Sequence, residues 1–162
     1  MLKVGINGFG RIGRMVMRVT LGQDKVKVVA INDLADNDTL AHLFKYDSVY
    51  GKLDADLKAD DQGFVLNGER INVFSEREPA NIPWKDSGVD VVIESTGIFR
   101  KRDTASAHLS AGARRVIITA PAEADRPVAV KIITVPQSQR FPGGGIHRRL
   151  AVEKKQVEGF KR

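Results

Sequence analysis

The sequence predicts an α/β fold, with a doubly wound, mostly parallel sheet, helices on both faces and a β-hairpin excursion. Short runs rich in β-branched residues alternate with segments whose apolar residues recur at helical spacing. An Asn-Gly pair between two strand-like runs indicates a tight hairpin turn. With 42% hydrophobic and 28% charged residues, the 162-residue chain is long enough to bury the core of such a fold.

The first strand, helix and strand are expected within residues 2–32. Leu2–Asn7 has the pattern of a short strand, and Arg11–Leu21 carries apolar residues close to helical period. Gly22 is a plausible end for that helix. Val26–Asn32 is rich in β-branched residues and is expected to pair in parallel with the first strand, because the interval between them suits a βαβ unit.

A helix and a hairpin are expected next along the chain. Asn37–Phe44 has a helical pattern, with Asp36 or Asn37 as its N-cap. The Asn67-Gly68 pair separates Phe64–Leu66 from the run ERINVF, and these residues supply the positive φ angles of a type I′ turn. We expect this hairpin to be antiparallel and to stand outside the strand–helix alternation.

The alternation then resumes and ends before a basic tail. Val89–Glu94 and Arg115–Thr119 are predicted strands, with a short helix over Asp103–Ser110 between them and Val128–Val135 as one more strand. We therefore expect one α/β domain over residues 1–135. Residues 136–162 form a divergent tail, in which Leu150–Phe160 could be a final helix.

The net charge of +6 is concentrated in the last quarter of the chain. Residues 1–121 hold 17 Lys and Arg against 16 Asp and Glu, whereas residues 122–162 hold 9 against 4. Such an excess can attract nucleic acid, but it more often marks a solvated terminus. Nucleic-acid binding is therefore possible but not favoured.

A glycine motif opens the first predicted helix. Gly8, Gly10 and Gly13 have the spacing G-x-G-x-x-G, directly after a strand and at the start of a helix. In dinucleotide-binding folds, the first such glycine permits a tight turn, the second lets a pyrophosphate approach the backbone and the third lets the helix pack closely on the strand. The free N–H groups of the helix then face the phosphates.

Asp33 follows the second strand, where such folds place an acidic residue on the adenosine ribose. Its carboxylate can accept hydrogen bonds from both ribose hydroxyls and would repel a 2′-phosphate. The two signals together predict NAD, rather than NADP, as the cofactor. The alternative for Asp33 alone is a turn or cap residue.

Several segments resemble the glyceraldehyde-3-phosphate dehydrogenase family, in that family's order and near its spacing. They are KVGINGFGRIGR, INDL, TLAHLFKYDSVYGKL, SEREPANIPW, VDVVIESTGIF and RRVIITAP, and they cover residues 1–121. The resemblance implies that the domain over residues 1–135 is a Rossmann-type NAD-binding domain of a glycolytic oxidoreductase. It implies that Arg11 and Ile12 offer backbone N–H groups to the pyrophosphate, that Asp33 holds the ribose, and that Asn7 and Phe9 shape the glycine turn. The lack of cysteine and of a signal-peptide pattern separately indicates the cytoplasm as the default compartment.

The resemblance also implies further cofactor contacts. Arg77 would lie beside the adenine, and other residues would line the path toward the nicotinamide: Ser95, Thr96, Gly97, Phe99 and Thr119. Taken without the resemblance, Arg77 is a surface cation, Phe99 a core residue and the Ser-Thr-Gly run an ordinary strand end.

The sequence departs from the family at its nucleophile. The family uses a cysteine thiolate, and this chain contains no cysteine. We therefore expect the match to stop before the catalytic cysteine, and we assign no catalytic residue. His147 does not match the family's catalytic histidine motif, and His42 and His108 are expected to be structural or exposed.

The sequence is compatible with more than one kind of partner. A separate chain could supply the missing catalytic domain, or the chain could form a homo-oligomer. The alternative class is a non-catalytic nucleotide- or RNA-binding interaction protein that uses the basic tail. No apolar run is long enough to predict a membrane span, and the sequence pattern predicts no metal site.

Overall fold

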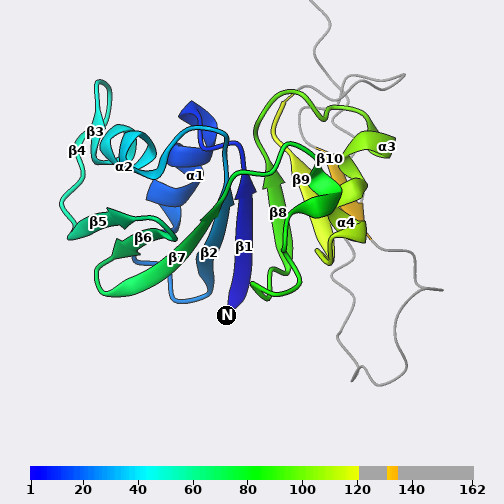
Figure 1. Ribbon diagram of the computed structural model, residues 1–162, viewed down its shortest axis with the longest axis horizontal. Helices are drawn as coiled ribbons and strands as arrows, with labels where there is room; N and C mark the ends of the chain where they lie inside the picture. Colours follow the sequence, from blue (N-terminus) through cyan, green and yellow to red (C-terminus); the bar gives the residue numbers. More distant parts are fainter. Residues whose placement is uncertain (121–130, 135–162) are drawn as a thin grey trace, which may run out of the picture.

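The computed structural model describes residues 1–120 and 131–134, and its centre is an eight-stranded sheet of order β10-β9-β8-β1-β2-β7-β6-β5 (Figure 1). A separate two-stranded sheet pairs β3 with β4. The strands are β1 Leu2–Asn7, β2 Val26–Asn32, β3 Tyr46–Asp47, β4 Gly51–Lys52, β5 Leu57–Asp60, β6 Gly63–Leu66, β7 Glu69–Phe74, β8 Val91–Glu94, β9 Arg115–Ile118 and β10 Lys131–Thr134.

Strand β1 lies in the middle of the parallel part of the sheet. It pairs in parallel with β2 on one side and β8 on the other, and β7 and β9 extend the two sides. The chain therefore adds β2 and β7 on one side of β1 first, and later adds β8 and β9 on the other side. Doubly wound folds bind their ligands at such a reversal, outside the carboxyl ends of the two strands, here β1 and β8. The predicted fold class is confirmed.

The helices lie on both faces of the sheet, as predicted. Helix α1 (Arg11–Thr20) and α2 (Asn37–Lys45) accompany the half that contains β1, β2 and β7, whereas α3 (Arg102–Ala105) and α4 (Ala107–Ser110) lie beside β8 and β9 (Figure 1). A short 3₁₀ helix, η1, covers Pro79–Asn81.

Two buried clusters match this arrangement. One joins Met17 and Phe44 of α1 and α2 to Val4, Ile6 and other residues on one face of the sheet. The second cluster lies on the opposite face, where its members are Ala30, Ile82, Trp84, Val89, Val92, Ala105, Ala113, Val116 and Ile118. Alternate side chains of each central strand therefore serve different cores.

Local hydrogen bonds explain two helix boundaries. Asp36 is the N-cap of α2, because its side chain accepts a hydrogen bond from the Thr39 N–H at 2.8 Å. The single helix predicted over Asp103–Ser110 is wrong: α3 and α4 are separate short helices. Between them Ser106 donates to the Arg102 carbonyl from its N–H at 2.9 Å and from its hydroxyl at 2.6 Å, and back-bonding of this kind often bends a helix.

The hairpin was predicted correctly, but its place in the sheet was not. Strands β6 and β7 are antiparallel, and the turn residues Asn67 and Gly68 have φ angles of 51° and 83°. However, β7 also pairs in parallel with β2 through Asn72 and Phe74, so it belongs to the strand–helix alternation. Strands β3, β4 and β5 were not predicted, because runs of two to four residues carry too little periodicity.

The end of the chain is described only in part. Strand β10 falls within the strand predicted over Val128–Val135 and pairs antiparallel with β9. The rest of that prediction, the tail over residues 136–162 and the helix predicted over Leu150–Phe160 lie outside the described residues. In the described part of the chain, no helix is long and apolar enough to cross a membrane.

An ion pair between β5 and β7 makes the stability of the fold depend on pH. The two terminal guanidinium nitrogens of Arg70, on β7, each donate to one carboxylate oxygen of Asp60, at the end of β5, at 2.7 Å. The side-chain hydrogen bonds from Arg70, helped by the Gln62 N–H, lower the pKa of Asp60 from 3.8 to about 2. Because folding lowers the pKa of Asp60, the ion pair stabilises the folded state fully at a pH above 3.8, the pKa of the unfolded chain. This stabilisation is lost as the pH falls through about 2, the pKa in the folded state.

We expect Arg70→Gln to raise the pKa of Asp60 toward 3.8, measured by carbon-13 NMR of the carboxyl group during an acid titration. Asp36 is the internal control, because the Thr39 amide, not an arginine, lowers its pKa. An Asp60 titration that is the same in both proteins would show that the ion pair does not form in solution.

Candidate dinucleotide site

The glycine turn between β1 and α1 follows the carboxyl end of β1, and the three glycines of the motif meet different surroundings. A Cβ on Gly8, whose φ is +89°, would lie 2.7 Å from the backbone nitrogen of Thr96. A Cβ on Gly13 would lie 2.2 Å from the carbonyl oxygen of Gly8. By contrast, a Cβ on Gly10 would meet nothing within 4 Å. Two glycines therefore permit close packing, and the third borders open space.

The first turn of α1 presents to that space backbone N–H groups that have no partner among residues 1–120 and 131–134. Gly10 is the N-cap and has no side chain with which to cap the helix. The first helical bond runs from the Arg14 N–H to the Gly10 carbonyl at 3.1 Å, so the N–H groups of Arg11, Ile12 and Gly13 precede it. Free N–H groups and the positive end of the helix dipole make such a terminus attractive to an anion.

Asp33 is fixed beside the glycine turn. Its Oδ2 accepts a hydrogen bond from the Phe9 N–H at 2.7 Å, and its Oδ1 accepts one from the Ala35 N–H at 3.1 Å. The side chain is half-buried, and each oxygen has a second lone pair that could accept a ligand hydroxyl. A hollow continues from here between the loop after β2 and the end of β7, lined in part by Leu34, Asp36 and Phe74.

The residues after β8 close the other side of the turn. The Ser95 hydroxyl donates to the Gly8 carbonyl at 2.7 Å, and the Ser95 N–H donates to the Asn7 carbonyl at 2.8 Å. Thr119, at the end of β9, donates from its N–H to the Glu94 carbonyl at 3.0 Å. Ser95, Thr96 and Thr119 therefore lie at the carboxyl ends of β8 and β9.

The other predicted site residues differ in their surroundings. Gly97 is exposed with a φ of +75°, and Arg77 is exposed in the loop between β7 and η1. Phe99 is half-buried, with its ring edge-on to His108 at 6.4 Å between centroids. The side chain of Phe9 is fully buried under the turn, where its ring centroid lies 5.5 Å from that of Phe44.

A chain of buried polar side chains runs beneath the site, and sequence reasoning did not identify it. Its members are Asn7, Asn32, Glu94 and His108, whose exposed fractions are 3% or less, and it ends at the indole of Trp84. His108 was expected to be structural or exposed; it is buried and hydrogen-bonded, whereas His42 is exposed. The available signal was an asparagine at the end of each of two predicted neighbouring strands.

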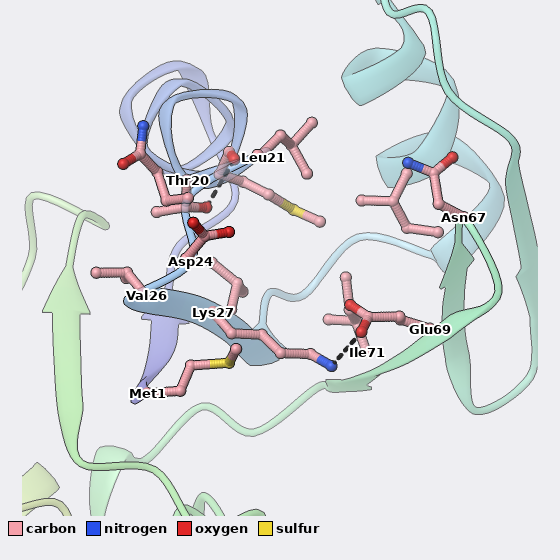
Figure 2. Close-up of a pocket in the computed structure, with 14 residues that line it drawn as sticks. Met1, Thr20, Leu21, Asp24, Val26, Lys27, Asn67, Glu69 and Ile71 are labelled. Carbon is pink, nitrogen blue, oxygen red and sulfur yellow. Dashed lines mark hydrogen bonds and ion pairs between the residues drawn. The ribbon is translucent and has the colours of Figure 1, made fainter.

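A different hollow lies at the amino ends of the strands, between the end of α1 and the β6–β7 turn (Figure 2). Lys27 and Glu69 form a 2.8 Å ion pair across its floor. Because the ligands of doubly wound folds bind at the carboxyl ends of the strands, this hollow is not the dinucleotide site.

Comparison with known proteins agrees with this geometry. Residues 2–102 match the family model described as glyceraldehyde 3-phosphate dehydrogenase, NAD binding domain. The chain belongs to this family. It is 58% identical over 121 residues to glyceraldehyde-3-phosphate dehydrogenase of Priestia megaterium, and 50% identical over 122 residues to glyceraldehyde-3-phosphate dehydrogenase 3 of Saccharomyces cerevisiae. These alignments cover 75% of this chain, but only 36% and 37% of the relatives.

The family assignment gives NAD as the cofactor of this domain. The resemblance described from the sequence is confirmed. The alternative of an RNA-binding interaction protein receives no support from these matches. Since the chain spans little more than a third of its relatives' length, their complete activity does not transfer to it directly.

The close packing at Gly13 predicts a sharp contrast between two glycine substitutions. We expect Gly13→Ala to destabilise the domain by about 1–3 kcal/mol, because its methyl group would collide with the Gly8 carbonyl. Gly10→Ala adds the same methyl group in open space, so we expect a loss below about 1 kcal/mol. Urea unfolding of both variants measures the difference. Equal losses would show that helix α1 does not pack this closely on β1.

Proposed function

We propose that this chain binds NAD through the glycine turn, the first turn of α1 and Asp33. The observation that carries the proposal is the meeting of these three features at the topological switch between β1 and β8. The pyrophosphate would accept hydrogen bonds from the N–H groups of Arg11 and Ile12, above the open face of Gly10. The adenosine ribose would donate its hydroxyls to Asp33.

The remaining predicted residues are proposed to extend the site. Arg77 would lie beside the adenine, in the direction of the hollow beyond β2 and β7. Ser95, Thr96, Gly97 and Thr119 would border the path to the nicotinamide, with Phe99 as a supporting residue. Asn7 and Phe9 would act from below by shaping the turn, since both side chains are buried.

We further propose that the chain contributes cofactor binding to aldehyde oxidation, the glycolytic reaction for which its relatives are named. NAD would accept a hydride in such a reaction. The cysteine nucleophile that the family resemblance implies is not among these 162 residues. A catalytic domain on another chain, or a homo-oligomer, is a proposed partner, and co-purification would detect either. The division into a domain at 1–135 and a tail at 136–162, and the cytoplasmic location, stay predictions.

The role of Asp33 is tested by a matched pair of substitutions. We expect Asp33→Asn to weaken NAD binding roughly tenfold or more, because hydrogen bonds to a charged acceptor contribute about 1.5–3 kcal/mol. The variant should also discriminate less against NADP, since the carboxylate that repels the 2′-phosphate is gone. Isothermal titration calorimetry of each protein with NAD and NADP measures both effects.

Asp86→Asn is the control, because it removes an equal charge from an exposed side chain in the loop that leads into β8, at the opposite edge of the sheet. Its affinity for NAD should match that of the wild type. If both variants lose affinity equally, Asp33 acts through general charge and not through the ribose. If the wild type does not bind NAD, the proposed function is wrong.

A further inference from the structure

The Glu94 side chain is a buried carboxylate surrounded by hydrogen-bond donors. It is 1% exposed, at the end of β8 and beneath the proposed dinucleotide site. Its Oε1 accepts from the N–H and hydroxyl of Thr96, at 2.9 and 2.5 Å. Its Oε2 lies 2.6 Å from Asn7 Nδ2 and 2.9 Å from His108 Nε2. Both carboxyl oxygens are therefore occupied as hydrogen-bond acceptors.

This acceptor sets the direction of the hydrogen bonds on the side toward β2. Oε2 of Glu94 accepts from the NH₂ group of Asn7, so the oxygen of the Asn7 amide faces Asn32. Asn32 Nδ2 therefore donates to Asn7 Oδ1 at 2.8 Å and also to the Glu76 carbonyl at 2.9 Å. The Asn32 oxygen is left to accept from the Glu76 N–H at 2.8 Å.

The same logic holds on the side toward the second core. The indole N–H of Trp84 donates to His108 Nδ1 at 3.0 Å, so this nitrogen carries a lone pair. The ring proton therefore lies on Nε2, from which it is donated to Glu94. One oriented chain of hydrogen bonds thus runs from Trp84 through Glu94 to the backbone of Glu76.

We propose that Glu94 is a positioning residue of the dinucleotide site, acting through Asn7 and Asn32 on the loop after β7. This inference rests on the proposed function. The loop begins with Ser75 and Glu76 and carries Arg77, the residue proposed to lie beside the adenine. Glu94 itself is buried and touches no ligand; it fixes the orientation of the Asn32 amide that holds Glu76 by two hydrogen bonds. Asn32 also accepts the Gly8 N–H on its carbonyl at 2.8 Å, so the glycine turn and the loop share one anchor.

The variant Glu94→Gln tests the proposal, because it keeps the shape of the side chain but replaces one acceptor oxygen with a donor. In either orientation the new NH₂ group meets donors, either the Thr96 N–H or the NH₂ of Asn7. We expect hydrogen exchange of the Glu76 amide to accelerate, and the dissociation constant for NAD to rise, by at least about tenfold each. NMR measures the first in the ligand-free chain, and calorimetry measures the second.

A double variant distinguishes the effect of hydrogen-bond direction from the effect of side-chain size. In Glu94→Gln combined with Asn7→Asp, the glutamine NH₂ can donate to the new carboxylate, which still accepts from Asn32. We expect the double variant to bind NAD more tightly, and to protect the Glu76 amide better, than either single variant. Its recovery should be incomplete, because the bond from His108 is not restored. The indole signal of Trp84, the chain's single tryptophan, should therefore stay shifted in the double variant.

Ile71→Val is the control for a general loss of stability, since it trims the other core and leaves the hydrogen-bond chain intact. It should lower the melting temperature without accelerating Glu76 exchange. Unchanged Glu76 exchange in folded Glu94→Gln, or a double variant no better than the singles, would overturn the proposal. Failure of both Glu94 variants to fold would also overturn it, because the carboxylate would then be required for folding itself. A wild type that does not bind NAD would refute the proposed function, while Glu76 exchange would still decide the role of Glu94.

Discussion

Helix α1 can lie against β1 only because residue 13 has no side chain. The Gly13 backbone approaches the Gly8 carbonyl so closely that a methyl group would fall 2.2 Å from that oxygen. This contact fixes the distance and direction of the helix relative to the strand, and so directs its free N–H groups over the carboxyl end of β1. The same approach places Phe9 inside the core with Phe44 and Phe64. The anion-attracting helix terminus and the packing of one face of the sheet therefore follow from one van der Waals constraint.

The centre of the sheet changes character along its strands. Val4 and Ile6 of β1 and Val91 and Ile93 of β8 are buried among hydrocarbon side chains, whereas both strands end in buried polar residues. A buried polar group without a partner is costly, so these ends are stable only as a complete network. Among the described residues, the one buried side-chain nitrogen without a partner is Nε of Arg14, on α1. The network therefore places a set of hydrogen-bonded polar side chains directly below the proposed dinucleotide site.

The sequence predicts best those features whose determinants are local. The strand-to-helix turn of the glycine motif, the cap of α2 and the Asn67-Gly68 turn each depend on a few neighbouring residues. All three were located correctly, the cap as one of two alternatives, Asp36 or Asn37. The second pairing of β7 was not, because a hairpin pattern defines one neighbour of a strand and says nothing about its other edge. Likewise, Asn7 and Glu94 are 87 positions apart, and His108 reaches Glu94 from a helix. Only the register of β1 against β2 and β8 brings these groups together.

The central position of β1 also matters for synthesis. It is made before both of its neighbours: β2, which follows at once, and β8, whose residues pair with it 87 positions later. At a translation rate of 5–20 residues per second, β1 waits roughly 4–17 s with one edge unpaired. During that time the apolar residues of β1 and β2 stand in an unfinished sheet, which is a template for misassociation. A nascent chain of this topology should therefore be a client for chaperones until β8 leaves the ribosome.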